Sequence, residues 1–208
     1  MVDFQSRDRR TKGRDDDEDD EAATEESESV QEETDEEPAE TGPEEDATSE
    51  TASVGIAVVT VSDDRTVDDD PVGDAVVDAL DGHELVTREL LGRNHDSVQG
   101  AVDALVNRDD VDAVVTAGGT GIDTRDITVE AVHPLFEKAL PGFGELFRQR
   151  YHDRVGTDAI ATRATAGIAD GTPVFCLPGA TEAARLGASE IVSEQAGRLA
   201  EPDDGDTV

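Results

Sequence analysis

The sequence has few residues of several kinds, and each shortage excludes something. Cys176 is its only cysteine, which excludes an intramolecular disulfide and a cluster of thiolate metal ligands. No run of about 18 apolar residues occurs, so no segment is predicted to span a bilayer. Acidic residues rather than an apolar stretch follow the Arg9-Arg10 pair, so the sequence predicts no export signal. We therefore expect a cytoplasmic protein.

The chain is also short of positive charge. It carries 17 basic and 52 acidic side chains, a formal net charge of −35, and only Lys12 and Lys138 are lysines. Such a surface repels phosphate backbones and anionic membranes, which excludes nucleic-acid binding through a broad basic face. At about 1 M salt the Debye length falls to roughly 3 Å, and repulsion between surface carboxylates is then screened. The composition predicts a halophilic protein, with an acidic mesophilic protein as the alternative.

Charge and apolar content divide the chain into two parts. Residues 1–52 contain 5 basic and 22 acidic residues, show no apolar periodicity, and lack the apolar content to offset the cost of ordering. We expect a disordered acidic tail there, either a solvating extension or an interaction arm. Residues 53–208 are rich in valine, alanine, leucine and isoleucine, enough to bury the core of one domain of roughly 155 residues.

Within the second part, apolar patterns predict strands that alternate with helices. The continuous β-branched run at 54–62 is typical of a strand buried on both faces of a parallel sheet. The other predicted strands are 83–91, 112–116, 162–168 and 173–177, and the predicted helices are 72–80, 97–107, 127–135, 145–154 and 181–200. This order predicts a three-layer α/β/α fold with a mostly parallel central sheet.

Three loops of unusual composition follow predicted strand ends, where ligands bind in sheets of this kind. They cover residues 62–65, 116–126 and 177–181. In the second loop, Gly118, Gly119 and Gly121 let the backbone approach an anion closely, and Thr116 and Thr120 add hydroxyl groups. The loop has neither the lysine of a P-loop nor the third glycine of a dinucleotide site. A plain structural turn is the alternative.

The third loop precedes the last predicted helix. Pro178-Gly179 would place the free N–H groups of that helix opposite a phosphate, and an ordinary strand-to-helix turn explains the pair equally well. Cys176, in the apolar strand before this loop, is predicted to be a small core residue.

Four segments, in this order and spacing, resemble the molybdenum cofactor biosynthesis proteins of the MoaB/MogA type. They are Thr60-Val-Ser62 with Asp63 and Arg65, Thr116 to Gly121 with Arg125-Asp-Ile-Thr128, Pro141-Gly-Phe-Gly-Glu145 with Phe147-Arg148, and Leu177-Pro-Gly179. The resemblance runs from about residue 54 to residue 201. It implies binding of molybdopterin, a pterin dithiolene with a terminal phosphate, together with Mg-ATP.

The implied reaction is transfer of AMP onto the terminal phosphate of molybdopterin, with release of pyrophosphate. The attacking phosphate oxygen is already ionised at neutral pH, so catalysis would consist of positioning and charge neutralisation. A non-catalytic molybdopterin-binding oligomer, a carrier or assembly partner in the same pathway, is the alternative. The resemblance also implies a homo-oligomer, a trimer or a hexamer.

The resemblance assigns roles to residues of all three loops. Asp126 is the expected catalytic residue and Mg²⁺ ligand, since hard cations prefer carboxylate oxygens, and an ion pair with a nearby arginine is its alternative role. The residues expected to cradle the phosphate or adenylyl group are Gly118, Gly119, Thr120 and Gly121. The other expected substrate-binding residues are Ser62, Asp63, Thr116, Pro178, Gly179 and Ala180.

One departure from the family pattern bears on the choice between these two functions. In active members a Pro-Asp pair follows the second strand, and its aspartate helps to bind the metal ion. The corresponding residues here are Gly92 and Arg93, and Asp96 is three residues further on. If neither Arg93 nor Asp96 can supply a metal ligand, the binding-only alternative gains. Asp96 is more easily explained as an acidic residue in the first turn of a helix.

Overall fold

A six-stranded sheet forms the centre of the computed structural model, which describes residues 53–201. Its order is β2-β1-β3-β6-β5-β4. The strands are β1 (Gly55–Val61), β2 (Glu84–Leu91), β3 (Ala113–Ala117), β4 (Lys138–Ala139), β5 (Thr165–Ala169) and β6 (Thr172–Leu177). The predicted tail at 1–52 lies outside the described residues.

Four neighbouring strands, β2, β1, β3 and β6, are parallel, and β5 and β4 continue the sheet in antiparallel pairing. The change of direction comes from the hairpin between β5 and β6. Its two loop residues, Asp170 and Gly171, have φ angles of 49° and 81°. Left-handed residues at both loop positions give the turn that suits the twist of a two-residue hairpin.

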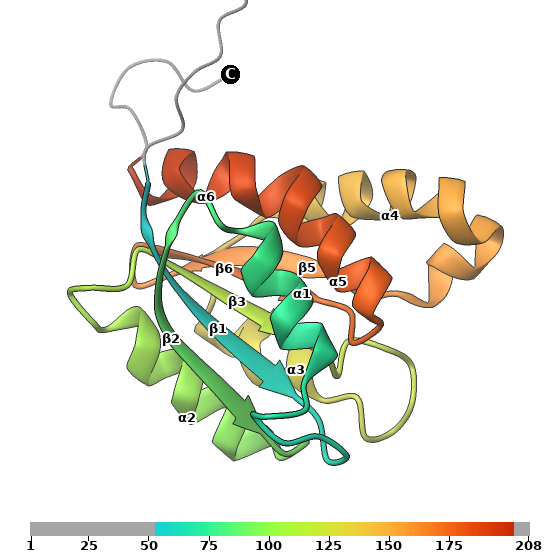
Figure 1. The fold of residues 1–208 in the computed structure, drawn as a ribbon, viewed down its shortest axis with the longest axis horizontal. Helices are drawn as coiled ribbons and strands as arrows, with labels where there is room; N and C mark the ends of the chain where they lie inside the picture. Colours follow the sequence, from blue (N-terminus) through green and yellow to red (C-terminus); the bar gives the residue numbers. More distant parts are fainter. Residues whose placement is uncertain (1–52, 202–208) are drawn as a thin grey trace, which may run out of the picture. The chain divides into compact units, whose positions relative to one another are not determined.

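Helices cover both faces of the sheet, as Figure 1 shows. One face carries α1 (Pro71–Ala79), α4 (Pro141–Val155), α5 (Thr181–Gly187) and α6 (Ser193–Ala200). The other carries α2 (His95–Val106) and α3 (Thr128–Val132). The predicted three-layer α/β/α fold with a mostly parallel sheet is therefore confirmed.

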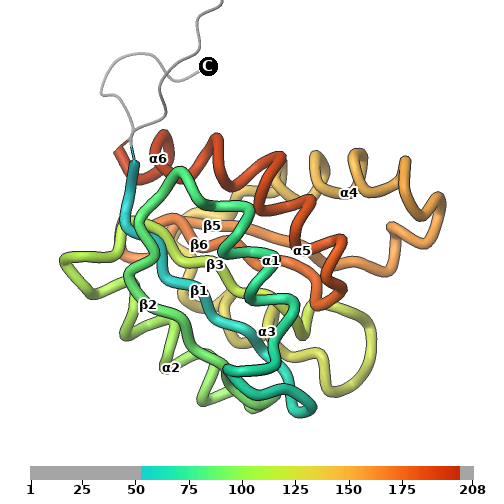
Figure 2. Tube along the Cα trace, in the orientation of Figure 1, coloured from blue at the N-terminus to red at the C-terminus, as the bar shows by residue number. Residues whose placement is uncertain are grey.

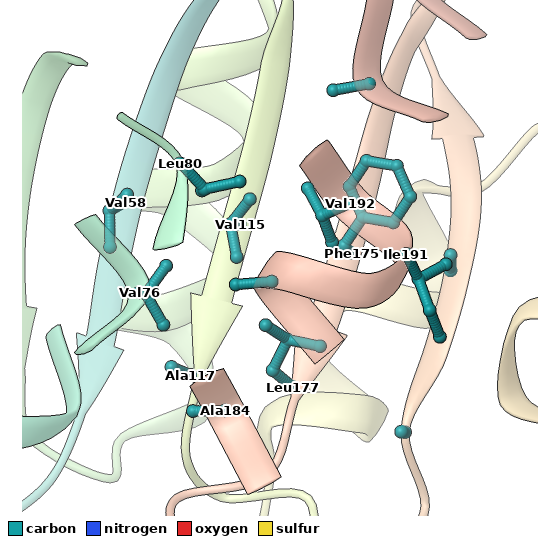
Figure 3. Close-up of a cluster of buried hydrophobic side chains, with 14 of the residues drawn as sticks. Val58, Val76, Leu80, Val115, Ala117, Phe175, Leu177, Ala184, Ile191 and Val192 are labelled. Atoms are coloured by element: carbon teal, nitrogen blue, oxygen red, sulfur yellow. The ribbon is translucent and has the colours of Figure 1, made fainter. Parts of the chain in front are cut away.

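Two apolar clusters, one on each face of the sheet, hold the layers together. Figure 3 shows the first, in which Val58 and Val115 of the sheet face Val76 of α1, with Leu177 and Ile191 beside them. Burying a side chain of this kind contributes about 1.5–3 kcal/mol. The second cluster joins the sheet to α2 and α3.

Cys176 lies in the second cluster and is fully buried, as predicted. Burial raises the pKa of its thiol to about 12. Among residues 53–201, no helix combines the length and the apolar character that a bilayer span needs.

The elements differ from the prediction in several places. The helix predicted at 145–154 begins earlier, at Pro141, since a proline without an N–H fits the first helical turn. The two-residue strand β4 was not predicted, because it has no apolar alternation to detect. The single helix predicted at 181–200 is divided by a π-helical stretch, Ala188–Val192.

A buried ion pair connects the start of α1 to β2. Asp70 has a fully buried side chain that accepts the Gly73 N–H at 3.1 Å and contacts Arg88 Nη2 at 3.0 Å. Arg88 Nη1 also donates to the exposed Asp74 at 2.6 Å. Burial raises the pKa of Asp70, but hydrogen bonding with Thr60, Gly73 and Arg88 and the positive charge of Arg88 outweigh it, so the pKa lies below its ordinary value of 3.8.

We expect Asp70→Asn to lower the free energy of unfolding by about 2 kcal/mol, because Arg88 loses its buried counter-charge. A lowered folded-state pKa means that the carboxylate stabilises the fold above pH 3.8 and loses this effect as the pH falls toward the lowered value. Urea unfolding should therefore give a difference between wild type and variant that is constant near neutral pH and shrinks below about pH 4.

The matched control is Asp74→Asn, which removes the exposed partner of the same arginine and should cost about 0.5 kcal/mol. An equal loss in both variants would contradict the central role of Asp70.

Candidate functional site

A cavity of about 340 Å³ opens at the carboxyl edge of the parallel strands. The loops after β1, β3 and β6 lie at the same end of the sheet, which Figure 2 lets the reader follow along the chain. Because β5 runs antiparallel to β6, its first residue, Thr165, pairs with Cys176 near the end of β6. The residues just before β5 therefore reach the same cavity.

Most of the predicted site residues line this cavity. They are Ser62, Gly118, Gly119, Thr120, Gly121, Asp126, Pro178 and Gly179. The structure thus brings together three loops that are far apart in the sequence. The roles expected of these residues stay predictions.

Three predicted residues do not line the cavity. Thr116 lies within β3, fully buried, and its hydroxyl donates to the Phe175 carbonyl at 3.4 Å. Asp63 is exposed, and its Oδ1 accepts the backbone N–H of Arg93 at 2.8 Å. Ala180 is exposed at the N-cap of α5. Strand register and turn direction fix where these three residues lie, and the contact with substrate expected of them stays a prediction.

Internal packing requires two glycines of the central loop. Gly118 has a φ of 111°, and a Cβ there would lie 2.3 Å from the Val61 carbonyl oxygen. Gly119 has a φ of 66°, and a Cβ would lie 2.3 Å from Thr128 Oγ1. Both glycines are needed for the turn itself, so their presence alone does not indicate a ligand. None of the hydrogen bonds found among residues 53–201 has the N–H of Gly119, Thr120 or Gly121 as its donor.

Arg163 holds this loop through three hydrogen bonds to backbone carbonyls. Its backbone N–H donates to the Thr120 carbonyl at 3.0 Å, its Nε to the Gly121 carbonyl at 2.7 Å, and its Nη2 to the Asp126 carbonyl at 2.9 Å. The same guanidinium pairs with Glu130. One side chain thus holds both Gly121 and Asp126. Arg163 was not predicted as a site residue because it belongs to no motif.

Asp126 forms an ion pair with an arginine, which was the alternative role considered for it. Its Oδ1 lies 3.6 Å from Arg93 Nη1, and its Oδ2 accepts the Asp123 N–H at 3.1 Å. The side chain of Asp126 is 13% exposed and that of Arg93 is 23% exposed. Arg93 stands where the family resemblance places a metal-binding aspartate, and its positive charge neutralises Asp126.

These residues do not fit a preformed magnesium site. Mg²⁺ in proteins takes octahedral oxygen ligands, with one or two carboxylates beside waters and substrate phosphates. Asp126 faces a guanidinium, and Asp96, the possible substitute, has a 96% exposed side chain next to His95. Among residues 53–201, no group of three histidine, cysteine, aspartate or glutamate residues could hold a metal ion.

Arg65 was not predicted as a site residue, although it lies in one of the three loops at the strand ends. Arg65 lines the cavity, and its Nη2 donates to the Gly179 carbonyl at 3.4 Å. Arg65 reaches from β1 past β3 to the loop after β6, while Arg93 reaches from β2 past β1 to the loop after β3. An arginine just after a predicted strand end was the available signal for both.

The fold agrees with comparisons to known proteins. Residues 57–198 match the family described as "Probable molybdopterin binding domain", and the chain belongs to this family.

More particularly, it is similar to proteins named "Molybdenum cofactor biosynthesis protein B". The one from Bacillus subtilis (strain 168) is 42% identical over 138 residues, 65% of this chain and 81% of that protein. The one from Escherichia coli (strain K12) is 37% identical over 142 residues, 67% of this chain and 84% of that protein.

Solved structures of proteins from this family are also similar to this chain. A crystal structure of a molybdenum cofactor biosynthesis protein B has a TM-score of 0.70 and 37% identity, covering 72% of this chain and 95% of that one. The tungsten cofactor synthesizing protein MoaB from Pyrococcus furiosus has a TM-score of 0.64 and 35% identity, covering 71% and 94%. The resemblance to the MoaB/MogA type is therefore confirmed.

We expect Arg163→Lys to loosen the glycine loop, because a lysine lacks the planar fork that reaches two carbonyls. The loss of one to two charged hydrogen bonds should lower the local free energy of opening by about 1 kcal/mol, or about fivefold in rate. Amide hydrogen exchange of residues 118–126 measures this directly.

The control is Arg154→Lys, whose side chain is 53% exposed and pairs with Glu182 and Glu190 far from the loop in sequence. Unchanged exchange of the loop in Arg163→Lys would show that its backbone holds itself in place.

Proposed function

We propose that the protein acts in molybdenum cofactor biosynthesis by binding molybdopterin in the cavity at the carboxyl edge of the sheet. The observation that carries this proposal is the convergence of Arg65 and Arg93 with the loop Gly118 to Gly121 in one cavity. The family to which the chain belongs and the names of its relatives give the pathway and the ligand.

A terminal phosphate suits this cavity for electrostatic reasons. Two guanidinium groups line it beside the carboxylates of Asp64 and Asp126, so the lining is close to neutral in a chain whose formal net charge is −35. Guanidinium groups bind phosphate through paired, charge-assisted hydrogen bonds. Backbone N–H groups of a glycine-rich turn form a further concave anion site. The pterin would extend from the phosphate toward the rest of the cavity.

Transfer of AMP from Mg-ATP onto the bound phosphate is a second candidate function. In that reaction an oxygen of the molybdopterin phosphate forms a bond to the α-phosphorus of ATP, and the bond to the leaving pyrophosphate breaks. The observation that favours it is that Asp126 lines the same cavity with a mostly buried side chain. Mg²⁺ at Asp126 would lie close to the positive charge of Arg93, whose Nη1 is 3.6 Å from Oδ1, so we rank this function second.

One pair of measurements tests both candidates. Molybdopterin binding and pyrophosphate release are measured on the same anaerobic samples in molar KCl with Mg-ATP. Wild type should bind molybdopterin and release no pyrophosphate. Arg65→Gln should weaken binding about tenfold to a hundredfold, the effect of losing a charge-assisted hydrogen bond. Arg125→Gln, at an exposed arginine that pairs with Asp123, should bind like wild type.

Failure of wild type to bind molybdopterin would overturn the proposed function. Pyrophosphate release by wild type that is lost in Asp126→Ala would establish the transferase instead. Oligomeric state remains a prediction from the resemblance, a trimer or a hexamer.

We also propose that the protein is halophilic, which its charge supports. The temperature midpoint of unfolding should rise between about 0.1 M and about 1 M KCl, as the Debye length falls from roughly 10 Å to roughly 3 Å. A midpoint that stays constant or falls over this range would contradict the proposal.

A further inference from the structure

Arg93 is held in a defined position at the side of the cavity. Its backbone N–H donates to Asp63 Oδ1 at 2.8 Å, in the turn between β2 and α2. The next residue, Asn94, caps α2 by accepting the Ser97 N–H at 2.9 Å. The backbone of Arg93 is thus fixed on both sides, and its side chain extends to the loop after β3.

The guanidinium of Arg93 is only partly engaged. Nη1 lies 3.6 Å from Asp126 Oδ1, close enough for charge attraction but long for a hydrogen bond. Nε is shielded from solvent, and no acceptor among the described residues pairs with it. A shielded donor without an acceptor is costly, and Nε itself is out of reach of a ligand, so an anion would bind through the exposed part of the side chain, which is 23% exposed in all. Arg93 therefore has donors available for a ligand while Asp126 keeps its charge balanced.

We propose that the guanidinium of Arg93 takes the place of a divalent cation in this site. Asp126 positions it, and it binds the terminal phosphate of the ligand, so that binding needs no added metal ion. The inference rests on the proposed function, since it concerns the same ligand and cavity. It assigns Asp126 a positioning role through Arg93, in place of metal coordination.

Charge and ligand geometry both support this assignment. A divalent cation next to Asp126 Oδ1 would share that oxygen with a guanidinium at 3.6 Å, and like charges repel most strongly where side chains are mostly shielded from water. The other oxygen, Oδ2, already accepts the Asp123 N–H. A small cation that demands octahedral coordination would therefore meet one oxygen that accepts a hydrogen bond and one that faces a positive charge.

The experiment measures the dissociation constant of molybdopterin in molar KCl, once with excess EDTA and once with excess MgCl₂. Wild type should give the same constant in both. Arg93→Asp places a second carboxylate beside Asp126. In EDTA it should bind about tenfold to a hundredfold more weakly than wild type, and MgCl₂ should restore binding.

A second measurement does not depend on the pterin. Electron paramagnetic resonance of Mn²⁺, in molar KCl that screens the acidic surface, should detect a tight site in Arg93→Asp and none in wild type. The matched control is Arg125→Asp, which makes the same charge change on the exposed side of the loop, where Arg125 pairs with Asp123. Like wild type, it should show no tight Mn²⁺ site, and it should bind molybdopterin with the wild-type dissociation constant.

Arg93→Gln tests the inference if the Arg93→Asp variant does not fold. It should weaken molybdopterin binding in EDTA, and MgCl₂ should not rescue it, because one carboxylate remains. Wild-type binding that requires MgCl₂, or unchanged binding by Arg93→Gln in EDTA, would overturn the inference and leave the proposed function standing. No wild-type binding in either condition would overturn the proposed function itself.

Discussion

The site depends on the close approach of three backbones at Gly118. Its N–H donates to the Leu177 carbonyl, and its carbonyl accepts the Thr128 hydroxyl at 2.7 Å. A Cβ there would collide with the end of β1 at Val61, and a Cβ on Gly179 would lie 3.1 Å from the Gly118 Cα. The ends of β1, β3 and β6 can therefore meet only where no side chain intervenes. The contact of these strand ends at Gly118 brings together the three loops that line the cavity.

The few arginines around the cavity connect its loops to one another. Arg65 and Arg93 each reach across one neighbouring strand to a loop on its far side. Arg163 holds the central loop from behind by three hydrogen bonds to its carbonyls. In a protein with an excess of carboxylates, these three arginines thus bind backbone carbonyls or individual carboxylates around the three loops. Arginine suits this use better than lysine, because its planar fork contacts two acceptors at once.

Much of the fold was predictable because it follows from local patterns. The β-branched run of β1 gave a buried parallel strand, and Val98 and Val102 gave the buried face of α2. Short or interrupted elements were missed: β4 has two residues, and the π-helical stretch at Ala188–Val192 leaves the apolar pattern unbroken. The start of α4 at Pro141 was missed because proline both ends helices and begins them, and only packing distinguishes the two.

The candidate site divides in the same way. The sequence by itself determined the three-layer architecture, the loops that meet at the strand ends and the family, because hydrophobic period, glycine spacing and motif order are local properties of the chain. Only the tertiary structure decided that Thr116 faces the core, that Asp63 binds the backbone of Arg93, and that Arg93 reaches Asp126. These contacts join residues 30 or more positions apart, and their geometry depends on strand order and register, which no local pattern contains.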